Sequence, residues 1–157
     1  MAVGSRDKGS DGRHNKAELY SHSTLSWKTK TSYPFHWTIQ AFEILAESDS
    51  FILFGGLYPY QRADLSTGFY ETDIIAKFNP GSNKWTKLGN LQTRRHAFSV
   101  IEIKTKYLVM GGQENKNTET CELINEKIQC TSRESILNDF HYYPALMIVA
   151  SDYAENC

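Results

Sequence analysis

A pair of adjacent glycines that follows an apolar run occurs twice in the chain. The first pair is Gly55-Gly56, after residues 51–54 (FILF), and the second is Gly111-Gly112, after residues 107–110 (YLVM). Short unbroken apolar runs are typical of strands buried on both faces, and glycines permit φ > 0 where segments pack closely. The second copy of this pattern predicts a repeated β unit.

Two further markers recur at a similar spacing. A histidine that precedes an apolar segment occurs as His36, His96 and His141, at spacings of 60 and 45 residues. An anchor residue lies 9 to 11 positions before each histidine, and these anchors are Trp27, Trp85 and Cys130. The mean histidine spacing, about 52 residues, is close to ~50 residues, the upper part of the range that indicates a repeat architecture. Three markers in one register therefore favour a repeat architecture.

The order of these residues resembles that of the kelch-repeat family of β-propellers. The resemblance rests on the double glycines, one tryptophan and the Arg-His pair, which are Gly55, Gly56, Gly111, Gly112, Trp85, Arg95 and His96. It implies an all-β fold of kelch-type blades, each of four antiparallel strands, and structural roles for these seven residues. Trp27 and Trp85 are expected to pack between blades. The chain departs from the family pattern at Cys130, where the family has tryptophan, and at His36 and His141, which follow phenylalanine instead of arginine.

The resemblance covers residues 27–157 as a partial propeller. Strands are expected at residues 25–30, 36–45, 51–55, 72–78, 84–87, 97–103, 106–110, 118–124 and 127–131. They give blade units over about residues 36–88 and 95–131, with a partial third unit from residue 141. Closed propellers typically contain 4–8 blades, so we expect an incomplete ring, a fragment of a larger protein. The remaining blades would come from the same chain or from a partner subunit. Residues 1–26 are polar and are expected to form a disordered leader.

Two cysteines are placed to form a disulfide. In the segment from Cys121 to Cys130, a two-residue turn at Asn125-Glu126 would pair the cysteines directly across two antiparallel strands. Opposed Cα atoms in such a pair lie ~4.5–5.5 Å apart, which suits a disulfide. A disulfide favours an extracellular over a cytoplasmic location. The alternative is a pair of free thiols in a cytosolic repeat protein.

Composition excludes several functions. The net charge of -1 and the pI near 6.5 provide no basic patch for nucleic acid, and no apolar run is long enough to span a membrane. Metal-binding and nucleophile motifs are absent from the sequence, so we expect no cofactor, no catalytic residue and no enzyme activity. The alternative is a propeller oxidase whose missing blades supply the metal ligands.

The expected function is therefore protein–protein interaction. Alternating strand directions place the loops at residues 57–71, 88–95, 113–117 and 132–140 on one face. The candidate contacts in or beside these loops are Tyr58, Tyr60, Arg62, Arg94, Asn115 and Arg133, because tyrosine and arginine are enriched at binding hot spots. In the alternative, the aromatic residues fold back over the blade end. A second function class is an extracellular structural or adhesion-type kelch protein held together by disulfides.

Overall fold

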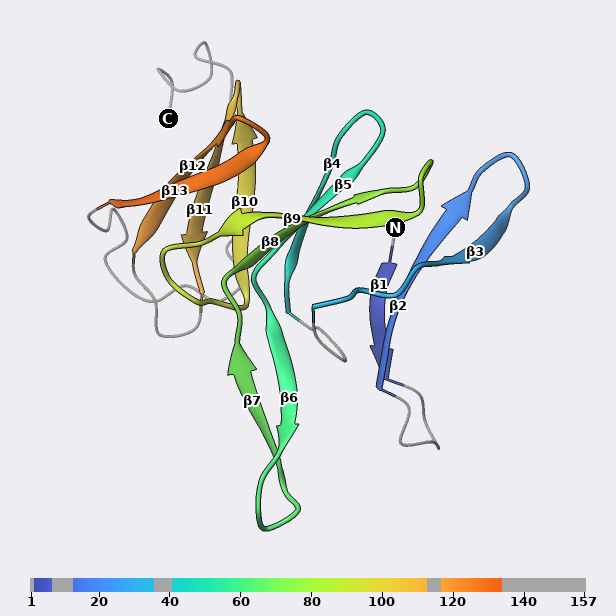
Figure 1. Cartoon of the computed structure of the whole chain (residues 1–157), viewed down its shortest axis with the longest axis horizontal. Helices are drawn as coiled ribbons and strands as arrows, with labels where there is room; N and C mark the ends of the chain where they lie inside the picture. Colours follow the sequence, from blue (N-terminus) through green and yellow to red (C-terminus); the bar gives the residue numbers. More distant parts are fainter. Residues whose placement is uncertain (1, 7–12, 36–40, 113–116, 134–157) are drawn as a thin grey trace, which may run out of the picture.

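The computed structural model describes residues 2–6, 13–35, 41–112 and 117–133, and these contain thirteen β-strands (Figure 1). The strands form a sheet of eight, a sheet of three and a sheet of two. No helix is found among the described residues, so the predicted all-β fold is confirmed. For the same reason, these residues contain no helix with the length and apolar character to cross a membrane.

The eight-stranded sheet consists of two units of four antiparallel strands, as predicted. The first unit contains β4 (Glu43–Ala46), β5 (Phe51–Phe54), β8 (Ile74–Asn79) and β9 (Lys84–Asn90). The second contains β10 (Phe98–Ile103), β11 (Lys106–Gly111), β12 (Thr118–Ile124) and β13 (Lys127–Arg133). Within each unit the strands pair in chain order. Every expected strand between residues 51 and 131 is present, with small differences at the ends.

The two units lie against each other and enclose the larger core. Their last strands, β9 and β13, pair in parallel where Ile128 lies opposite Gly89, and their first strands, β4 and β10, are in contact. The enclosed cluster includes Phe54, Phe98 and Val109, none of them more than 1% exposed. The apolar runs of β5 and β11 are therefore buried, as the sequence predicted, because each supplies side chains to the core between the two four-stranded units.

The three-stranded sheet corrects the prediction for the leader. β1 (Ala2–Arg6) and β2 (Arg13–Ser21) lie within residues 1–26 and pair antiparallel, and β2 pairs with β3 (Ser26–Lys30). The prediction of disorder is wrong for these strands, because cross-strand pairing organises a segment that has no apolar period of its own. Tyr20, for example, lies opposite Trp27, with ring centroids 5.4 Å apart.

The two tryptophans differ in their packing. Trp27 is 56% exposed, so the expectation that it packs between blades is wrong. Trp85 contacts Tyr33, with ring centroids 5.0 Å apart, and donates a hydrogen bond from Nε1 to the main-chain oxygen of Thr31 at 2.9 Å. It thus joins the first four-stranded unit to the segment that follows β3. His36, Asn115, His141 and the third partial unit lie outside the described residues.

Candidate partner-binding surface

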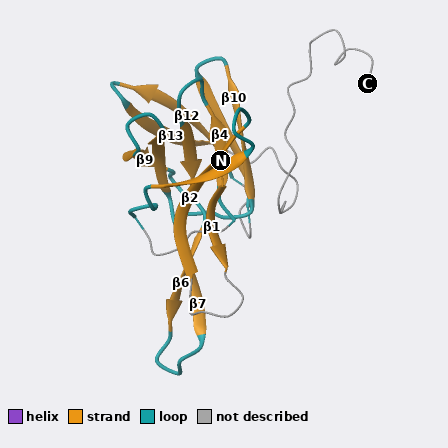
Figure 2. Ribbon diagram, turned by 90° about the vertical axis from the view of Figure 1, so that its right-hand side faces the viewer, coloured by secondary structure: helices purple, strands orange, loops and turns teal. Residues whose placement is uncertain are grey.

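A two-stranded hairpin projects from the first four-stranded unit. It consists of β6 (Leu57–Gln61) and β7 (Thr67–Glu71), which occupy the stretch predicted as the longest loop. Figures 1 and 2 show the hairpin extending away from the main sheets. Its turn is closed by a hydrogen bond from the Arg62 amide to the Ser66 carbonyl at 2.9 Å, and the Asp64 carboxylate accepts from the Ser66 amide at 2.9 Å. The loop is therefore an ordered projection.

The first double glycine forms the base of this hairpin. Gly55 and Gly56 have φ of 51° and 112°, which side-chain-bearing residues rarely adopt. The Gly56 amide donates to the Arg95 carbonyl at 2.9 Å, and the Thr72 amide donates to the Gly56 carbonyl at 2.9 Å. A Cβ atom on Gly55 would lie 2.8 Å from the same Arg95 oxygen. The glycines thus allow the segment at Arg95 to pass against the root of the hairpin.

A side-chain hydrogen bond provides a second connection at the root. The Glu71 carboxylate, at the end of β7, lies 2.6 Å from Nδ1 of His96. His96 is mostly buried, whereas Glu71 is about one-third exposed. The hairpin is therefore joined to the start of the second four-stranded unit by both main-chain and side-chain contacts.

The aromatic residues of the hairpin pack on one another. Tyr60 and Tyr70 stack with ring centroids 4.0 Å apart and planes at 21°, and Tyr58 lies 5.6 Å from Tyr70. Gly68 lies beneath the Tyr60 ring, where a Cβ atom would overlap it. Aromatic pairs of this kind contribute ~0.5–1.5 kcal/mol beyond the area they bury. The stack therefore stabilises the hairpin itself.

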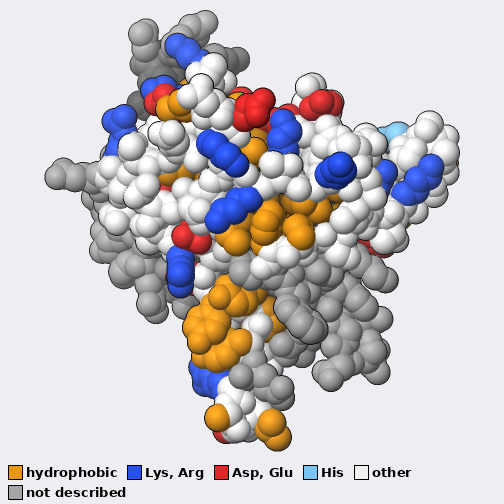
Figure 3. Space-filling view, in the orientation of Figure 1, with side chains coloured by type: hydrophobic (Ala, Val, Ile, Leu, Met, Phe, Trp, Pro, Cys, Tyr) orange, Lys and Arg blue, Asp and Glu red, His pale blue; other side chains and the backbone are white. Residues whose placement is uncertain are grey.

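Large apolar side chains on this hairpin remain accessible. Phe69 is 50% exposed, Tyr70 47% and Leu65, at the turn, 77%. Figure 3 shows hydrophobic side chains gathered along the projection in the lower part of the view. Large apolar side chains exposed on a projecting element are typical of an interaction surface.

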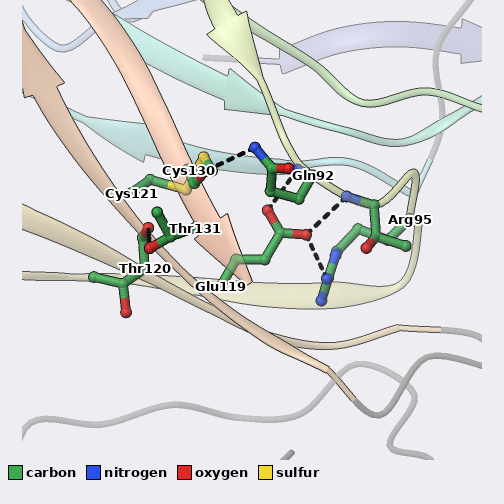
Figure 4. The surroundings of a disulfide bond; sticks show 8 residues. Gln92, Arg95, Glu119, Thr120, Cys121, Cys130 and Thr131 are labelled. Atoms are coloured by element: carbon green, nitrogen blue, oxygen red, sulfur yellow. Dashed lines mark hydrogen bonds and ion pairs between the residues drawn. A yellow bond between two sulfur atoms is a disulfide. The ribbon is translucent and has the colours of Figure 1, made fainter. Parts of the chain in front are cut away.

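A buried ion pair supports the neighbouring loop (Figure 4). Arg95 and Glu119 are both 0% exposed, and Nη2 of Arg95 lies 2.6 Å from Oε1 of Glu119. Arg95 also donates to the carbonyls of Gly111 and Asn117, at 3.0 and 2.9 Å. Burial lowers the pKa of the Arg95 guanidinium, and the adjacent Glu119 carboxylate opposes this shift.

Glu119 also organises the main chain that precedes Arg95. Its two carboxylate oxygens accept from the amides of Gln92 and Thr93, at 2.8 and 3.0 Å. One buried carboxylate therefore holds the loop between β9 and β10, which carries Arg94 on its exposed side. Sequence reasoning did not identify Glu119. The available signal was an acidic residue two positions before a cysteine, hence on the same face of its strand.

The predicted disulfide is present. Cys121 and Cys130 lie opposite each other in β12 and β13, with Cα atoms 4.0 Å apart and a bond between their sulfurs. The cysteine sulfurs and the Glu119 carboxylate are close enough together to resemble a metal-ligand set. The sulfurs are bonded to each other, however, and the carboxylate is paired with Arg95, so these groups are already engaged.

The predicted contact residues lie in different places. Tyr58 and Tyr60 are half-buried in the aromatic stack, and Arg62 is exposed near the tip of the hairpin. Arg94 is exposed beside the hairpin root, whereas Arg133 is exposed at the end of β13, opposite Thr118. Asn115 is outside the described residues. The structure therefore brings Arg94 close to the base of the hairpin and places Arg133 on another strand end.

The chain is similar to known proteins both in sequence and in structure. No known protein-family profile matches the chain. A stretch of 58 residues is 34% identical to Kelch-like protein 11 of Homo sapiens and, to the same extent, to that of Mus musculus. This stretch is 37% of the present chain and 8% of those proteins. The solved structure of YjhT superposes with a TM-score of 0.67 at 11% identity, over 88% of this chain and 49% of that one.

Proposed function

We propose, from the premise that the chain is a kelch-type β-propeller segment, that it is a protein-interaction module that binds its partner through the β6–β7 hairpin. The likeness to Kelch-like protein 11 and to the YjhT structure supports the fold in this premise. Fold alone does not select a function. The observation that carries the proposal is the exposure of three large apolar side chains, Leu65, Phe69 and Tyr70, on a projection anchored at its root.

The surface combines the features of a binding hot spot. Tyr70 presents a large ring that is already ordered by Tyr60, so binding costs little side-chain entropy. Arg62 near the tip and Arg94 near the root add exposed cationic groups at the two ends of the hairpin. Aromatic residues and arginine are the types most enriched at interface hot spots. This combination favours a protein partner.

A matched pair of substitutions tests the proposal. Tyr70→Ser removes a 47% exposed ring from the hairpin, and Tyr20→Ser removes a 38% exposed ring from the three-stranded sheet. Proteins cross-linked to the full chain in cells would be identified by mass spectrometry and their affinities measured with purified components. We expect Tyr70→Ser to weaken binding at least tenfold, about 1.4 kcal/mol, and Tyr20→Ser to leave it unchanged. Equal affinities for both variants would refute the assignment of the hairpin.

A second candidate function is an extracellular structural or adhesion-type protein. The disulfide between Cys121 and Cys130 favours it, because disulfides persist mainly in oxidising compartments. Intact mass of the protein purified from its natural source, after alkylation without reductant, would test this candidate. A bridged pair leaves both cysteines unmodified, whereas alkylation of both would remove its main support.

A further inference from the structure

We propose that an extended peptide segment of the partner adds as a third strand to the outer edge of β7, at Phe69. This inference rests on the proposed interaction function and specifies how the hairpin recognises its partner. The hairpin is a sheet of only two strands. Both outer edges therefore carry main-chain groups that no third strand of the described residues satisfies, and such edges are templates for strand addition.

The register of the hairpin determines which groups face outward. The Arg62 amide donates to Ser66, and the Thr72 amide donates to Gly56, so these are hydrogen-bonded pairs. Hydrogen-bonded and non-hydrogen-bonded pairs alternate along an antiparallel ladder. The pair Pro59–Phe69 falls at a non-hydrogen-bonded position. The N–H and C=O of Phe69 therefore point away from β6, and neither has a hydrogen-bond partner within the described part of the chain.

The two edges are not equivalent. At the same level of the ladder, β6 carries Pro59, which has no N–H to donate to an incoming strand. Proline is a common means of blocking an edge against strand addition. Phe69 on β7 offers both a donor and an acceptor. The hairpin thus presents one obstructed edge and one open edge.

The side chains beside the open edge indicate what the peptide carries. Phe69 and Tyr70 project to opposite faces of the hairpin, because successive residues of a strand alternate, and each is about half exposed. A third strand would place its own side chains next to both rings. Apolar side chains on consecutive positions would cover them, and acidic residues at the peptide ends would complement the exposed Arg62 and Arg94.

The test compares proline on the two edges. Phe69→Pro removes the outward N–H without removing a hydrogen bond of the hairpin, and Phe69→Ala removes the ring but keeps the N–H. Gln61→Pro is the matched control, because Gln61 occupies an equivalent non-hydrogen-bonded position on β6. Ten-residue peptides would be selected from a display library on the full chain, and their affinities measured for each variant. Circular dichroism and urea midpoints would establish that the variants are folded.

We expect the selected peptides to bind Phe69→Pro about tenfold more weakly than Phe69→Ala, and Gln61→Pro as tightly as the unmodified chain. N-methylation of the peptide residue that pairs with Phe69 should cause a similar loss. Equal binding to Phe69→Pro and Phe69→Ala, with a loss in Tyr70→Ser, would overturn strand addition but leave the interaction surface intact. If no selected peptide changes its affinity between the hairpin variants, strand addition is also overturned. The cross-linking test of Tyr70→Ser would then decide separately whether the hairpin binds a protein partner.

Discussion

Removing the Glu119 carboxylate should strongly destabilise the protein. Arg95 and Glu119 are both fully buried, and their charged groups lie 2.6 Å apart. In Glu119→Ala the guanidinium would keep two carbonyl partners but lose its counter-charge. Breaking a buried pair from one side costs ~3–5 kcal/mol. The amides of Gln92 and Thr93 would also lose their acceptor, at ~1 kcal/mol or more for each amide that water cannot reach.

The free energy of unfolding is therefore expected to fall by at least about 4 kcal/mol, a large share of the ~5–15 kcal/mol that stabilises a typical domain. Urea unfolding followed by tryptophan fluorescence would measure it, with the slope compared between variants to detect changes in the denatured state. Arg95→Met combined with Glu119→Leu removes both charges and fills the space. This double variant should be more stable than Glu119→Ala, because no charge is then left buried without a partner.

Two results would refute this reasoning. A loss below about 1 kcal/mol in Glu119→Ala would mean that water or a rearranged side chain satisfies the guanidinium. The two groups would act independently if the double variant lost as much unfolding free energy as Arg95→Met and Glu119→Leu lose together as single variants. In either case the ion pair would not be what holds the loop between β9 and β10.

Three further predictions concern other parts of the fold. Replacing Cys121 and Cys130 together by serine should lower the free energy of unfolding by roughly 2–3 kcal/mol, the chain-entropy value for so short a loop, measured by urea unfolding; no loss would contradict it. Burial raises the pKa of Glu47, but hydrogen bonds from Lys77, Ser50 and Tyr107 outweigh it, so the net shift is downward. This carboxylate therefore contributes stability above its unfolded pKa of ~4.3. Glu47→Gln should be less stable than the unmodified chain at pH 7, and this difference in the free energy of unfolding should disappear as the pH falls through the folded pKa. Urea unfolding at a series of pH values would measure it, and a difference that stays constant with pH would contradict it. Gly55→Ala should lower the free energy of unfolding by at least ~1–2 kcal/mol, measured by thermal unfolding, because φ at this position is 51° and the new Cβ atom would meet the Arg95 oxygen. Gly81→Ala is the control, because a Cβ atom there would meet only Oδ1 of Asn79, at 3.3 Å.

Local pattern predicted the strands that are buried on both sides. The apolar runs before the double glycines form β5 and β11. A short continuous apolar run that ends at a turn signal is typical of a strand buried on both faces. The pairing of Cys121 with Cys130 was also predictable, since a two-residue turn determines the register of its hairpin. Asn125 and Glu126 both adopt positive φ, as that turn requires. These features depend on residues close together in sequence.

The features that were missed depend on residues far apart or on exposed backbone. β6 contains Pro59 and β7 contains Gly68, and both residues weaken a strand prediction. The hairpin forms nonetheless because Pro59 lies where no hydrogen bond within the hairpin is needed and Tyr60 covers Gly68. Glu119 lies 24 residues from Arg95, and no local pattern connects them. Polar β2 likewise acquires its structure through pairing with β1 and β3.

A fully buried ion pair and the hairpin that carries the exposed apolar side chains are linked through one residue, Arg95. Its side chain is held by Glu119, whereas its carbonyl accepts the Gly56 amide and its own amide lies 3.4 Å from the Thr72 carbonyl. Gly56 and Thr72 are the last hydrogen-bonded pair at the root of the hairpin. The root of the hairpin is therefore bonded to the main chain of the same residue whose side chain the buried ion pair holds. An interaction surface on a hairpin needs such a rigid support, because a freely pivoting projection would lose its orientation entropy on binding. The buried pair is an expensive way to stabilise a core, but it donates to the carbonyls of Gly111 and Asn117 and accepts from the amides of Gln92 and Thr93, and apolar side chains could form none of these hydrogen bonds.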